Sequence, residues 1–401
     1  MRVLISGASI AGPVLGYWLA RYGFDVTVVE RAPQPRKTGG HAVDLFRPAM
    51  DITEKMGLSD RVAELATGIT RLSITPEGAH HPIGVDLTRI YRAASDRHAE
   101  IMRDDLSEIY CAAGRETVEY VFGDSITDIA PDGQVTFERA PARRFDLVVG
   151  ADGLHSTVRR LTFGDEAGLT RFIGAHLAVM SLPKSLARDG QSIGHAGAGR
   201  IAAIYTSAHL DDARAVFLFS SDRPLAYHHR DTDRQQELLC AAFGGLHPQV
   251  DGWLALLDAT SPFYFDAVTQ LRLDSWSRGR VTLVGDAGYC PGPAVGGSTS
   301  LAVYGAYVLA GELAHAGGDP TRAFAAYERR LADPVRRSRA FARAAAKRLV
   351  PRSRASAWAI PLGARLFTML PPRLIAAVTQ RTSLTRLHDS MPVHDYSAHQ
   401  I

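Results

Sequence analysis

Short apolar runs alternate with amphipathic helical patterns near the start of the chain. Residues 2–6 form an apolar run that stops at Gly7, and residues 26–30 form a second run. Between them, residues 13–22 place apolar side chains at helical spacing. This order predicts a βαβ unit, in which a helix connects two parallel strands.

The middle of the chain mixes short strands with one helix, predicted over residues 98–112. Ile101, Leu106 and Ile109 share one face of that helix. A buried strand is predicted over residues 145–149, because this run is almost wholly apolar.

A second sheet is predicted between residues 171 and 273, where the pattern changes to separate strand-like runs at 201–205, 214–219 and 262–266. Residues 280–284 return to the parallel-strand pattern. A loop rich in Gly and Pro follows, and then a long helix of small residues over 299–316. The tail is predicted to be helical and to end near Tyr396.

Composition places the chain among folded enzymes. Of its 401 residues, 46% are hydrophobic and 22% are charged, which excludes a disordered or fibrous chain. Its three cysteines are scattered and form no CxxC pair. They predict neither a disulfide framework nor a zinc site, and they favour a cytoplasmic location.

The net charge of +3 conceals a basic C-terminal segment, because residues 336–386 contain twelve Lys or Arg and no Asp or Glu. Such a segment can attract nucleic acid or anionic lipid. Its basic residues alternate with apolar ones, so we interpret it as the solvated face of packed helices and expect no nucleic-acid partner. No apolar run is long enough to predict a membrane span.

The first chemical motif is the glycine loop of residues 7–12 (Gly-Ala-Ser-Ile-Ala-Gly), between the first strand and the first helix. Gly7 and Gly12 fit a dinucleotide fingerprint, in which a helix N-terminus receives a pyrophosphate. Ser9 replaces the usual middle glycine. Glu30 ends the second strand, where a carboxylate can accept hydrogen bonds from ribose hydroxyls.

A second glycine string, residues 197–202, matches the same fingerprint but follows no predicted strand and opens no helix. We interpret it as a hairpin turn. With one credible fingerprint, the chain is predicted to have no separate domain for a nicotinamide cofactor.

Two further motifs resemble those of a known family. Residues 148–159 contain Asp152 in the sequence Gly-Ala-Asp-Gly, and residues 280–287 contain Asp286 in Gly-Asp-Ala. They resemble the Asp-Gly and Gly-Asp motifs of the FAD-dependent monooxygenases of the aromatic-hydroxylase class, which includes p-hydroxybenzoate hydroxylase-like and tetracycline-monooxygenase-like enzymes. The resemblance spans residues 1–330.

Two other segments support this resemblance. Arg103, in Ile-Met-Arg-Asp-Asp-Leu, matches the family's arginine that reaches FAD, and residues 39–44 followed by Arg47 are similar to the segment beside the flavin. Three residues depart from the family pattern. Tyr289 stands where many members of the family have His. Ser298 stands where many have Gly, and Ser300 stands where many have Asn.

The resemblance implies a fold class of α/β, with a Rossmann-like FAD-binding domain interleaved with a β-sheet substrate domain and followed by C-terminal helices. The expected boundaries are 1–70, 98–170 and 274–330 for the FAD-binding domain, 71–97 and 171–273 for the substrate domain, and 331–401 for the C-terminal helical segment. The implied FAD contacts are Gly7, Ser9, Ile10, Ala11, Gly12, Glu30, Arg31, Arg103, Asp152, Asp286, Pro293, Gly296, Gly297, Ser298 and Thr299, with Arg47 beside the flavin.

The resemblance also implies the reaction. NADPH or NADH reduces the flavin and leaves, and O2 then forms a flavin C4a-hydroperoxide that hydroxylates or epoxidises the substrate. The implied substrate is an aromatic or polyketide-like small molecule, as in antibiotic biosynthesis or inactivation. The protein is expected to be a monomer or a homodimer.

Substrate contacts are expected from alternate positions of the second sheet. Phe217 with Phe219, and Phe263 with Phe265, form two pairs that either stack on a planar substrate or belong to the core. No catalytic base is assigned, although four side chains are chemically able to deprotonate a phenol. These are His176, His195, Tyr205 and Tyr264.

Three alternatives are left open. A flavin-dependent halogenase shares the fold, but Trp358-Ala-Ile-Pro361 matches the WxWxIP motif of halogenases only in part. A redox-silent FAD-binding protein is motivated by Tyr289 and Ser298. The third is a nucleic-acid binder that uses the basic tail.

Overall fold

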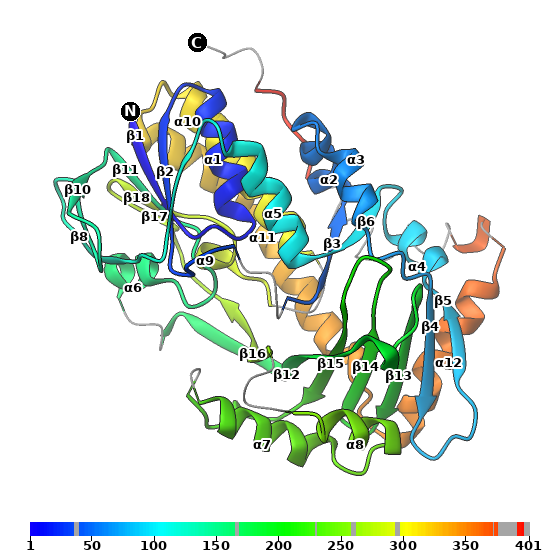
Figure 1. The fold of residues 1–401 in the computed structure, drawn as a ribbon. Coiled ribbons are helices and arrows are strands. Elements are labelled where there is room, and N and C mark those ends of the chain that lie inside the picture. The colour runs from blue at the N-terminus through cyan, green and yellow to red at the C-terminus, as the bar shows by residue number, and fades with distance from the viewer. Residues whose placement is uncertain are drawn as a thin grey trace.

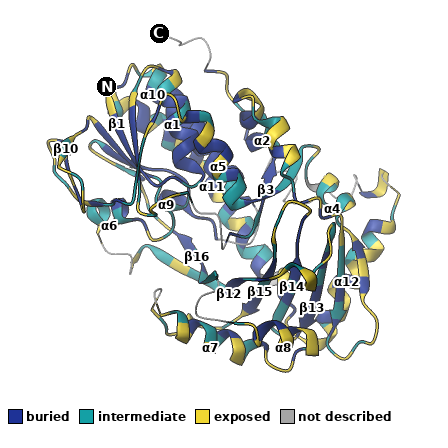
Figure 2. Ribbon diagram, viewed as in Figure 1, coloured by how far each residue is buried: buried dark blue, intermediate teal, exposed yellow. Residues whose placement is uncertain are grey.

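The computed structural model of the chain describes residues 1–35, 40–164, 168–228, 231–257, 262–292, 297–371, 373–375 and 391–396. Two large sheets lie at opposite ends of the molecule, and a ribbon and a long helix lie between them (Figure 1). Buried residues concentrate in the sheets and in the helices that cover them (Figure 2). The predicted α/β class and the C-terminal helices are confirmed.

The first sheet has six strands in the order β17-β18-β11-β1-β2-β7. Their bounds are β1 (Arg2–Ser6), β2 (Asp25–Glu30), β7 (Glu119–Phe122), β11 (Leu147–Gly150), β17 (Ser277–Arg278) and β18 (Val281–Leu283). All pairs are parallel except β17 with β18. Strand β1 lies at the centre, and its Val3, Leu4 and Ile5 are fully buried, as expected of a parallel sheet covered on both faces.

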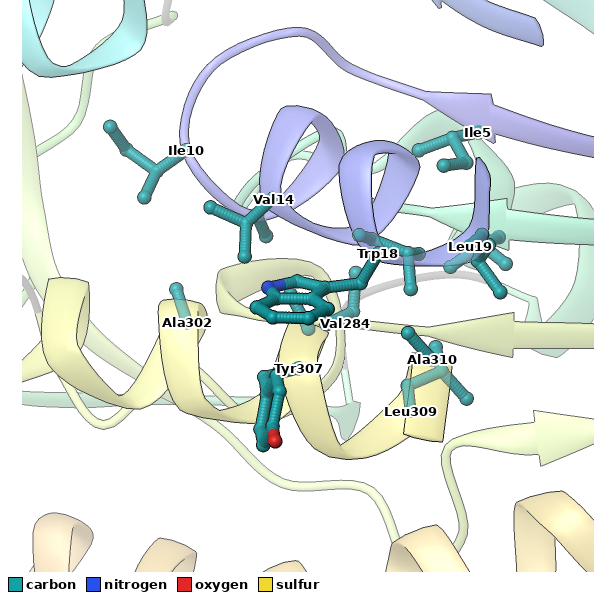
Figure 3. Close-up of a cluster of buried hydrophobic side chains, with 14 of the residues drawn as sticks. Ile5, Ile10, Val14, Trp18, Leu19, Val284, Ala302, Tyr307, Leu309 and Ala310 are labelled. Atoms are coloured by element: carbon teal, nitrogen blue, oxygen red, sulfur yellow. The ribbon is translucent and has the colours of Figure 1, made fainter. Parts of the chain in front are cut away.

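Helices α1 (Ala11–Arg21), α5 (Arg103–Gly114) and α10 (Ser298–His315) pack beside this sheet. Trp18 of α1 meets Tyr307 of α10 edge to face, with ring centroids 4.9 Å apart (Figure 3). Most of α10 is buried, because its many small residues allow close approach of its neighbours. This helix confirms the prediction over residues 299–316.

A two-stranded antiparallel ribbon, β3 (Ala42–Phe46) with β6 (His98–Met102), connects the two large sheets. The helix predicted over residues 98–112 is therefore wrong in its first turn, because residues 98–102 are a strand and α5 starts at Arg103. Ile101 pairs with Val43 across the ribbon. Two acidic residues in the first turn of α5 favour a helix N-terminus there. Helices α2 (Arg47–Lys55), α3 (Ser59–Glu64) and α4 (Leu87–Ala94) flank the ribbon.

The second sheet has seven strands in the order β16-β12-β15-β14-β13-β4-β5. Their bounds are β4 (Arg71–Pro76), β5 (Ile83–Asp86), β12 (Thr170–Pro183), β13 (Gln191–Gly197), β14 (Arg200–Tyr205), β15 (Asp212–Ser220) and β16 (Phe263–Leu271). Helices α7 (Thr232–Phe243) and α8 (Pro248–Leu254) cover one face. The predicted hairpin turn is confirmed, since β13 and β14 are joined through Gly199, which has a φ of +74°.

The remaining elements complete the fold. A small sheet contains β8 (Ile126–Ile129), β9 (Gln134–Phe137) and β10 (Arg143–Arg144), and the short helices are α6 (Thr157–Phe163), α9 (Asp286–Tyr289) and a 3₁₀ turn (Lys184–Leu186). Helix α11 (Pro320–Leu349) packs against both α10 and β12. Helix α12 (Arg354–Met369) packs against β4 and β5.

The end of the chain departs from the helical prediction. Residues 391–396 contain no helix and lie against α10, where the Tyr307 hydroxyl donates to the His394 carbonyl at 2.7 Å. Within the described part of the chain, no helix has both the length and the apolar character needed to cross a membrane.

Candidate cofactor and substrate site

The glycine loop after β1 is held in a conformation that excludes larger residues. Gly7 has a φ of +108°, and a Cβ there would lie 2.6 Å from the Ala151 carbonyl oxygen. A Cβ on Gly12 would overlap the carbonyl oxygen of Gly7. Ile10 is the N-cap of α1 and offers no side-chain cap, so the first N–H groups of the helix are free to bind an anion.

Glu30 at the end of β2 anchors this loop. Its carboxylate accepts hydrogen bonds from the backbone N–H of Ala8 and of Ala32, each at 2.9 Å. Each carboxylate oxygen can accept a further bond, so the position also suits ribose hydroxyls. The neighbouring Arg31 is exposed.

Arg103 reaches the same loop from the start of α5. Its Nε and Nη2 atoms lie 3.3 and 3.2 Å from the Ser9 hydroxyl. The residue that replaces the family's middle glycine is therefore bound to the arginine that the family directs at FAD.

Asp152 occupies a different position from the other motif residues. Its carboxylate accepts hydrogen bonds from the Ser156 hydroxyl and from the backbone N–H of Thr157 and Val158. It also accepts a bond from Ser6 at 3.3 Å. Asp152 thus joins the start of α6 to the end of β1, beside the glycine loop.

Asp286 begins α9 and lies beside the start of α10. Its Oδ1 accepts a 2.9 Å hydrogen bond from Ser298, and burial raises the pKa of its carboxyl group. The preceding Gly285 lies against α1, since a Cβ there would be 3.3 Å from that of Ala11. The Asp286 segment and the glycine loop with α1 are therefore adjacent.

The start of α10 also offers free backbone N–H groups. Gly297 is the N-cap with a φ of +88° and makes no side-chain cap, and the helix continues through Ser298 and the half-buried Thr299. Pro293 and Gly296 lie outside the described residues. We call the glycine loop, Glu30, Arg103, Asp286 and the first turn of α10 the cradle.

The three departures from the family pattern all have defined contacts. Ser298 bonds to Asp286, as described above. Ser300 accepts from the Phe46 N–H at 3.0 Å and donates to the Asp44 carbonyl at 3.3 Å, so it holds β3 beside α10. Tyr289 is fully buried and accepts a 3.1 Å hydrogen bond from Tyr327.

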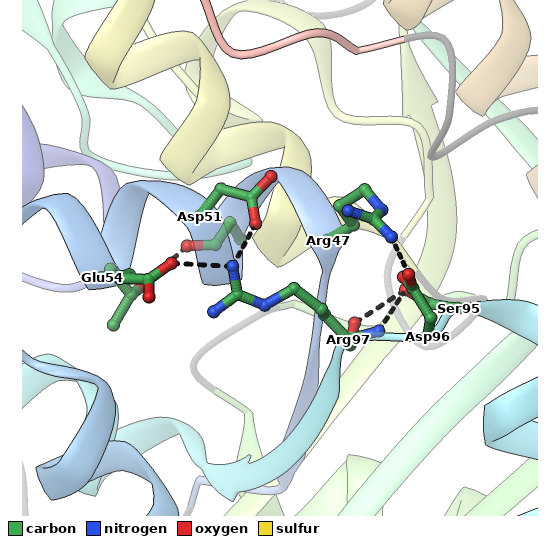
Figure 4. A network of polar contacts seen from close by, with 8 residues as sticks. Arg47, Asp51, Glu54, Ser95, Asp96 and Arg97 are labelled. Carbon is green, nitrogen blue, oxygen red and sulfur yellow. Dashed lines mark hydrogen bonds and ion pairs between the residues drawn. The ribbon is translucent and has the colours of Figure 1, made fainter.

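Arg47 lies at the edge of this region rather than within it. Its guanidinium forms an ion pair with Asp96, and both side chains are substantially exposed, at 40% and 65% (Figure 4). Arg97 beside them pairs with Asp51 and Glu54. Among the described residues, no hydrogen bond or ion pair joins Arg47 to the cradle, although the adjacent Phe46 bonds to Ser300.

The two faces of the seven-stranded sheet have different surroundings. Phe217, Phe219 and Phe265 pack with residues of α7 and α8 in a single apolar core. Val216 and Leu218, at alternate positions of β15, lie on the opposite face with Tyr264. The interpretation of the phenylalanine pairs as core residues is confirmed. Their alternative interpretation, as pairs that stack on a planar substrate, is not supported, because these rings lie on the face covered by α7 and α8.

The same alternation separates the four candidate bases. His176 stacks on Phe219, and His195 contacts Trp253 of α8, so both lie on the helix-covered face. Burial lowers the pKa of each to about 4. Tyr205 and Tyr264 lie on the other face, toward the ribbon and cradle.

Both tyrosines on this face are neutral near pH 7. Burial raises the pKa of Tyr205 and of Tyr264 above the ordinary range. Tyr205 accepts a 2.7 Å hydrogen bond from the Ala42 N–H. Each phenol can therefore serve as a hydrogen-bonding group, but neither is poised as a base.

Several polar residues of this region were missed from the sequence. Arg214 is almost fully buried and donates to the Gly40 carbonyl at 3.0 Å and to Ser181 at 2.9 Å, joining β15 to the segment before β3. The sequence signal that could have identified Arg214 was a single arginine within an apolar run. His41 lies beside Tyr264 at 6.4 Å between centroids, and burial, reinforced by Arg103, lowers its pKa to about 4.

Glu100 on β6 was also missed. It faces Asp44 across the ribbon and accepts hydrogen bonds from Thr67 and from Tyr91. Burial and the Asp44 charge raise the pKa of Glu100 to about 7. His98 bonds to Asp44 at 2.7 Å, which places a titratable network at the inner side of the ribbon.

The βαβ unit, its glycine loop and the Asp286 segment define a dinucleotide-binding protein. A family model described as an FAD binding domain matches residues 1–337. The chain therefore belongs to this FAD-binding family of flavin-dependent monooxygenases, and FAD is its cofactor.

One named relative agrees with this assignment, and a second relative and a solved structure are similar to the chain. A flavin-dependent monooxygenase of Legionella longbeachae is 34% identical over 330 residues, which cover 82% of this chain and 84% of the relative. An uncharacterised Mycobacterium tuberculosis protein, Rv1260, is 42% identical over 336 residues, covering 81% and 88%. The crystal structure of the tetracycline destructase Tet(55) is 29% identical, covers 98% of both chains and has a TM-score of 0.82.

Proposed function

We propose that this monooxygenase takes electrons from NADPH or NADH and inserts one oxygen atom of O2 into an aromatic or polycyclic, polyketide-like small molecule, by hydroxylation or epoxidation. The observation that supports the substrate class is the face of the seven-stranded sheet opposite α7 and α8, where Tyr205 and Tyr264 lie with Val216, and where Val179 and Leu218 share an apolar cluster with Val350. Such a surface suits a planar, largely apolar molecule with a few polar groups. Tet(55), whose name identifies a tetracycline destructase, supports a polycyclic substrate.

The residues of the cradle fit FAD, because the tight glycine loop, which has no room for a Cβ at Gly7 or Gly12, leads into a helix whose first N–H groups have no side-chain cap. In this proposal, the N–H groups of residues 9–12 receive the pyrophosphate and Glu30 holds the adenosine ribose. Arg103 contacts the phosphates, and Asp286 binds a hydroxyl of the ribityl chain. Asp152 positions the glycine loop, and Arg31 lies at its solvent edge.

The first turn of α10 is proposed to contact the flavin ring through the N–H groups of Gly297, Ser298 and Thr299, with Pro293 and Gly296 in the same loop. When bound, FAD supplies the electron transfer and the activation of O2. The positive end of the α10 dipole favours a negatively charged ring beside it. The buried apolar sheet face excludes water from the reacting carbon.

Polar residues on the sheet face orient the substrate in this proposal. Tyr264 is a neutral phenol that donates a 3.4 Å hydrogen bond to Asp266, which leaves its oxygen to accept one from the substrate. The Arg214 guanidinium already donates hydrogen bonds to the Gly40 carbonyl and to the Ser181 hydroxyl. It therefore fixes the segment before β3. Arg47 is proposed to lie beside the flavin. Both Arg47→Ala and Asp96→Ala remove the ion pair, but only Arg47→Ala removes the guanidinium. A slower flavin reduction in Arg47→Ala alone would therefore indicate a role beside the flavin.

The proposed domain organisation assigns 1–70, 98–170 and 274–330 to FAD binding, 71–97 and 171–273 to the substrate, and 331–401 to a C-terminal segment. It is supported by the strands of each sheet, since β4 and β5 join β12–β16. Free cysteines at positions 111, 240 and 290 are compatible with the proposed cytoplasmic location.

The decisive experiment follows NADPH and NADH oxidation by the FAD-loaded protein against a panel of phenols and polycyclic polyketides. Product mass is measured under isotopically labelled O2. We expect substrate-stimulated oxidation and a product that has gained one labelled oxygen atom. NAD(P)H oxidation that yields only hydrogen peroxide with every compound would contradict the substrate class.

The same assay distinguishes the alternatives. A redox-silent protein would bind FAD but oxidise neither nicotinamide with any compound. A halogenase would require chloride for product formation. Trp358 of the partial halogenase string lies on the exposed side of α12, a helix that packs on β4 and β5, so the string does not contribute to the cradle.

A further inference from the structure

The outward face of α12 (Arg354–Met369) is unusually apolar for a solvent-facing helix. Seven of the ten exposed large apolar side chains in the described part of the chain lie within residues 349–374. Five of them belong to α12, namely Trp358, Ile360, Leu362, Leu366 and Met369. Scattered exposed apolar residues are normal, whereas a contiguous group marks an interaction surface.

Helical spacing places most of this group on one stripe. Trp358, Leu362 and Leu366 follow one another at intervals of four residues, and Met369 follows three residues later. Their exposed fractions are 44%, 47%, 57% and 67%. The buried side of α12, formed by Ala357, Pro361 and Thr368, packs on the second sheet. Buried and exposed positions alternate along this helix (Figure 2), and the stripe lies among the exposed ones.

Basic side chains border the stripe. Arg365 lies beside it and is exposed, and it has no ion-pair partner within the described ranges. Arg354 is 79% exposed and keeps only a 3.3 Å contact with Glu77. The residues around the stripe, 350–375, contain four Arg and no acidic residue.

The apolar stripe and the basic residues beside it favour one kind of binding partner over the others. A symmetric pair of chains would place the same basic surface against itself, and the segment has no acidic residues to compensate. Nucleic acid would use the charges but leave the apolar stripe in water. A helix with an apolar face containing Trp and Leu, bordered by Arg, is typical of a helix that lies in a membrane interface.

We propose that the outward face of α12 binds the anionic surface of a lipid bilayer. Trp358, Leu362 and Leu366 insert among the headgroups, and Arg354 and Arg365 contact lipid phosphates. The site is separate from the cradle, and the inference does not depend on the substrate or on turnover.

The test uses the FAD-loaded protein with vesicles of phosphatidylglycerol and phosphatidylcholine, and with vesicles of phosphatidylcholine alone. We expect cosedimentation with the anionic vesicles that weakens as salt is raised. Trp358 also provides a spectroscopic signal, because Trp18, Trp253 and Trp276 are at most 7% exposed. Its fluorescence should shift to the blue on insertion, and a Trp358→Phe variant should lose that shift.

Matched variants identify the face. The double variant Leu362→Ser/Leu366→Ser should bind anionic vesicles more weakly by about tenfold or more, and Arg365→Glu should weaken binding at low salt. Leu186→Ser/Leu256→Ser, at sites 41% and 45% exposed elsewhere on the molecule, should bind as the wild type does. Bound FAD and the melting temperature verify that each variant is folded.

Two results would overturn the inference. One is an absence of vesicle binding by the wild type at low salt, or binding that the α12 variants leave unchanged. The other is a concentration-dependent dimer in light scattering that the α12 variants abolish, since the stripe would then be covered by a second copy.

Discussion

The hydroxyl group of Ser298 donates a 2.9 Å hydrogen bond to Oδ1 of Asp286 and so joins the first turn of α10 to the start of α9. The side chain of Ser298 holds the buried carboxylate in place. Ser298 therefore adds a constraint to the cradle.

Removal of the Asp286 carboxylate should release FAD while the fold is retained. We expect Asp286→Ala to weaken FAD binding by about ten- to a hundredfold, since hydrogen bonds to charged groups contribute about 1.5–3 kcal/mol. Ser298→Ala should have a smaller effect, about fivefold. Flavin absorbance after gel filtration and FAD titration of the apoprotein measure both. An Asp286→Ala protein that purifies fully yellow would contradict the role assigned to this residue.

Two glycines of α1 provide a matched pair. A methyl group at Gly12 would overlap the Gly7 carbonyl oxygen, whereas one at Gly16 would meet Val118 at an ordinary 3.5 Å. Gly12→Ala should abolish FAD binding and destabilise the fold by about 2–4 kcal/mol. Gly16→Ala should be neutral or stabilising by about 0.5–1 kcal/mol, because alanine favours a helix. Equal melting temperatures for the two variants would refute this account of the loop.

The buried Tyr289 requires a glycine opposite it. A Cβ on Gly305 of α10 would overlap the Tyr289 hydroxyl. Gly305→Ala should therefore destabilise the protein by about 1–3 kcal/mol. Combining it with Tyr289→Phe, which removes the overlapping oxygen, should recover part of the loss. A double-mutant cycle of unfolding free energies measures the coupling, and strictly additive effects would show that the two sites do not compete for space.

The ribbon carboxylate Glu100 predicts a pH dependence of stability. Its pKa is raised to about 7 from an ordinary value of 4.5, mainly by burial. The folded protein therefore holds a proton that the unfolded chain has already released at intermediate pH. Stability from this group is complete below about pH 4.5 and is lost as the pH rises through about 7.

Glu100→Gln keeps the group neutral and should remove this loss. The variant should gain stability relative to the wild type as pH rises from about 5 to 8, by an amount on the order of 2–3 kcal/mol at the upper end. Urea unfolding at several pH values measures the difference. Glu116→Gln, at an exposed site, is the control, and a parallel response of both variants would exclude the buried carboxylate as the cause.

The sequence predicted the FAD-binding part of the fold well, because the motifs that specify it are short and local. The glycine loop, the apolar run of β1 and the small residues of α10 each specify one backbone geometry. The start of α5 was misplaced because Ile101 fits helical spacing with Leu106 and Ile109. Only its pairing with Val43, which is distant in sequence, makes residues 98–102 a strand.

The substrate face could not be predicted to the same depth. Alternation along β15 separates Phe217 from Val216, but which set faces the cradle depends on where α7 and α8 pack. Likewise, Arg214 looks like one arginine among many until its contact with Gly40 is seen. Residue type gave the chemistry of each side chain, and tertiary packing decided its surroundings.

The division of the seven-stranded sheet into two faces has an evolutionary consequence. Positions such as Val216 and Leu218 can change without disturbing the phenylalanine core beneath α7 and α8, because neighbouring residues of a strand project to opposite sides. Mutational drift on one side is thereby uncoupled from the stability of the other. In the proposed arrangement, substitutions on the substrate side alter specificity while the phenylalanine core beneath α7 and α8 is retained.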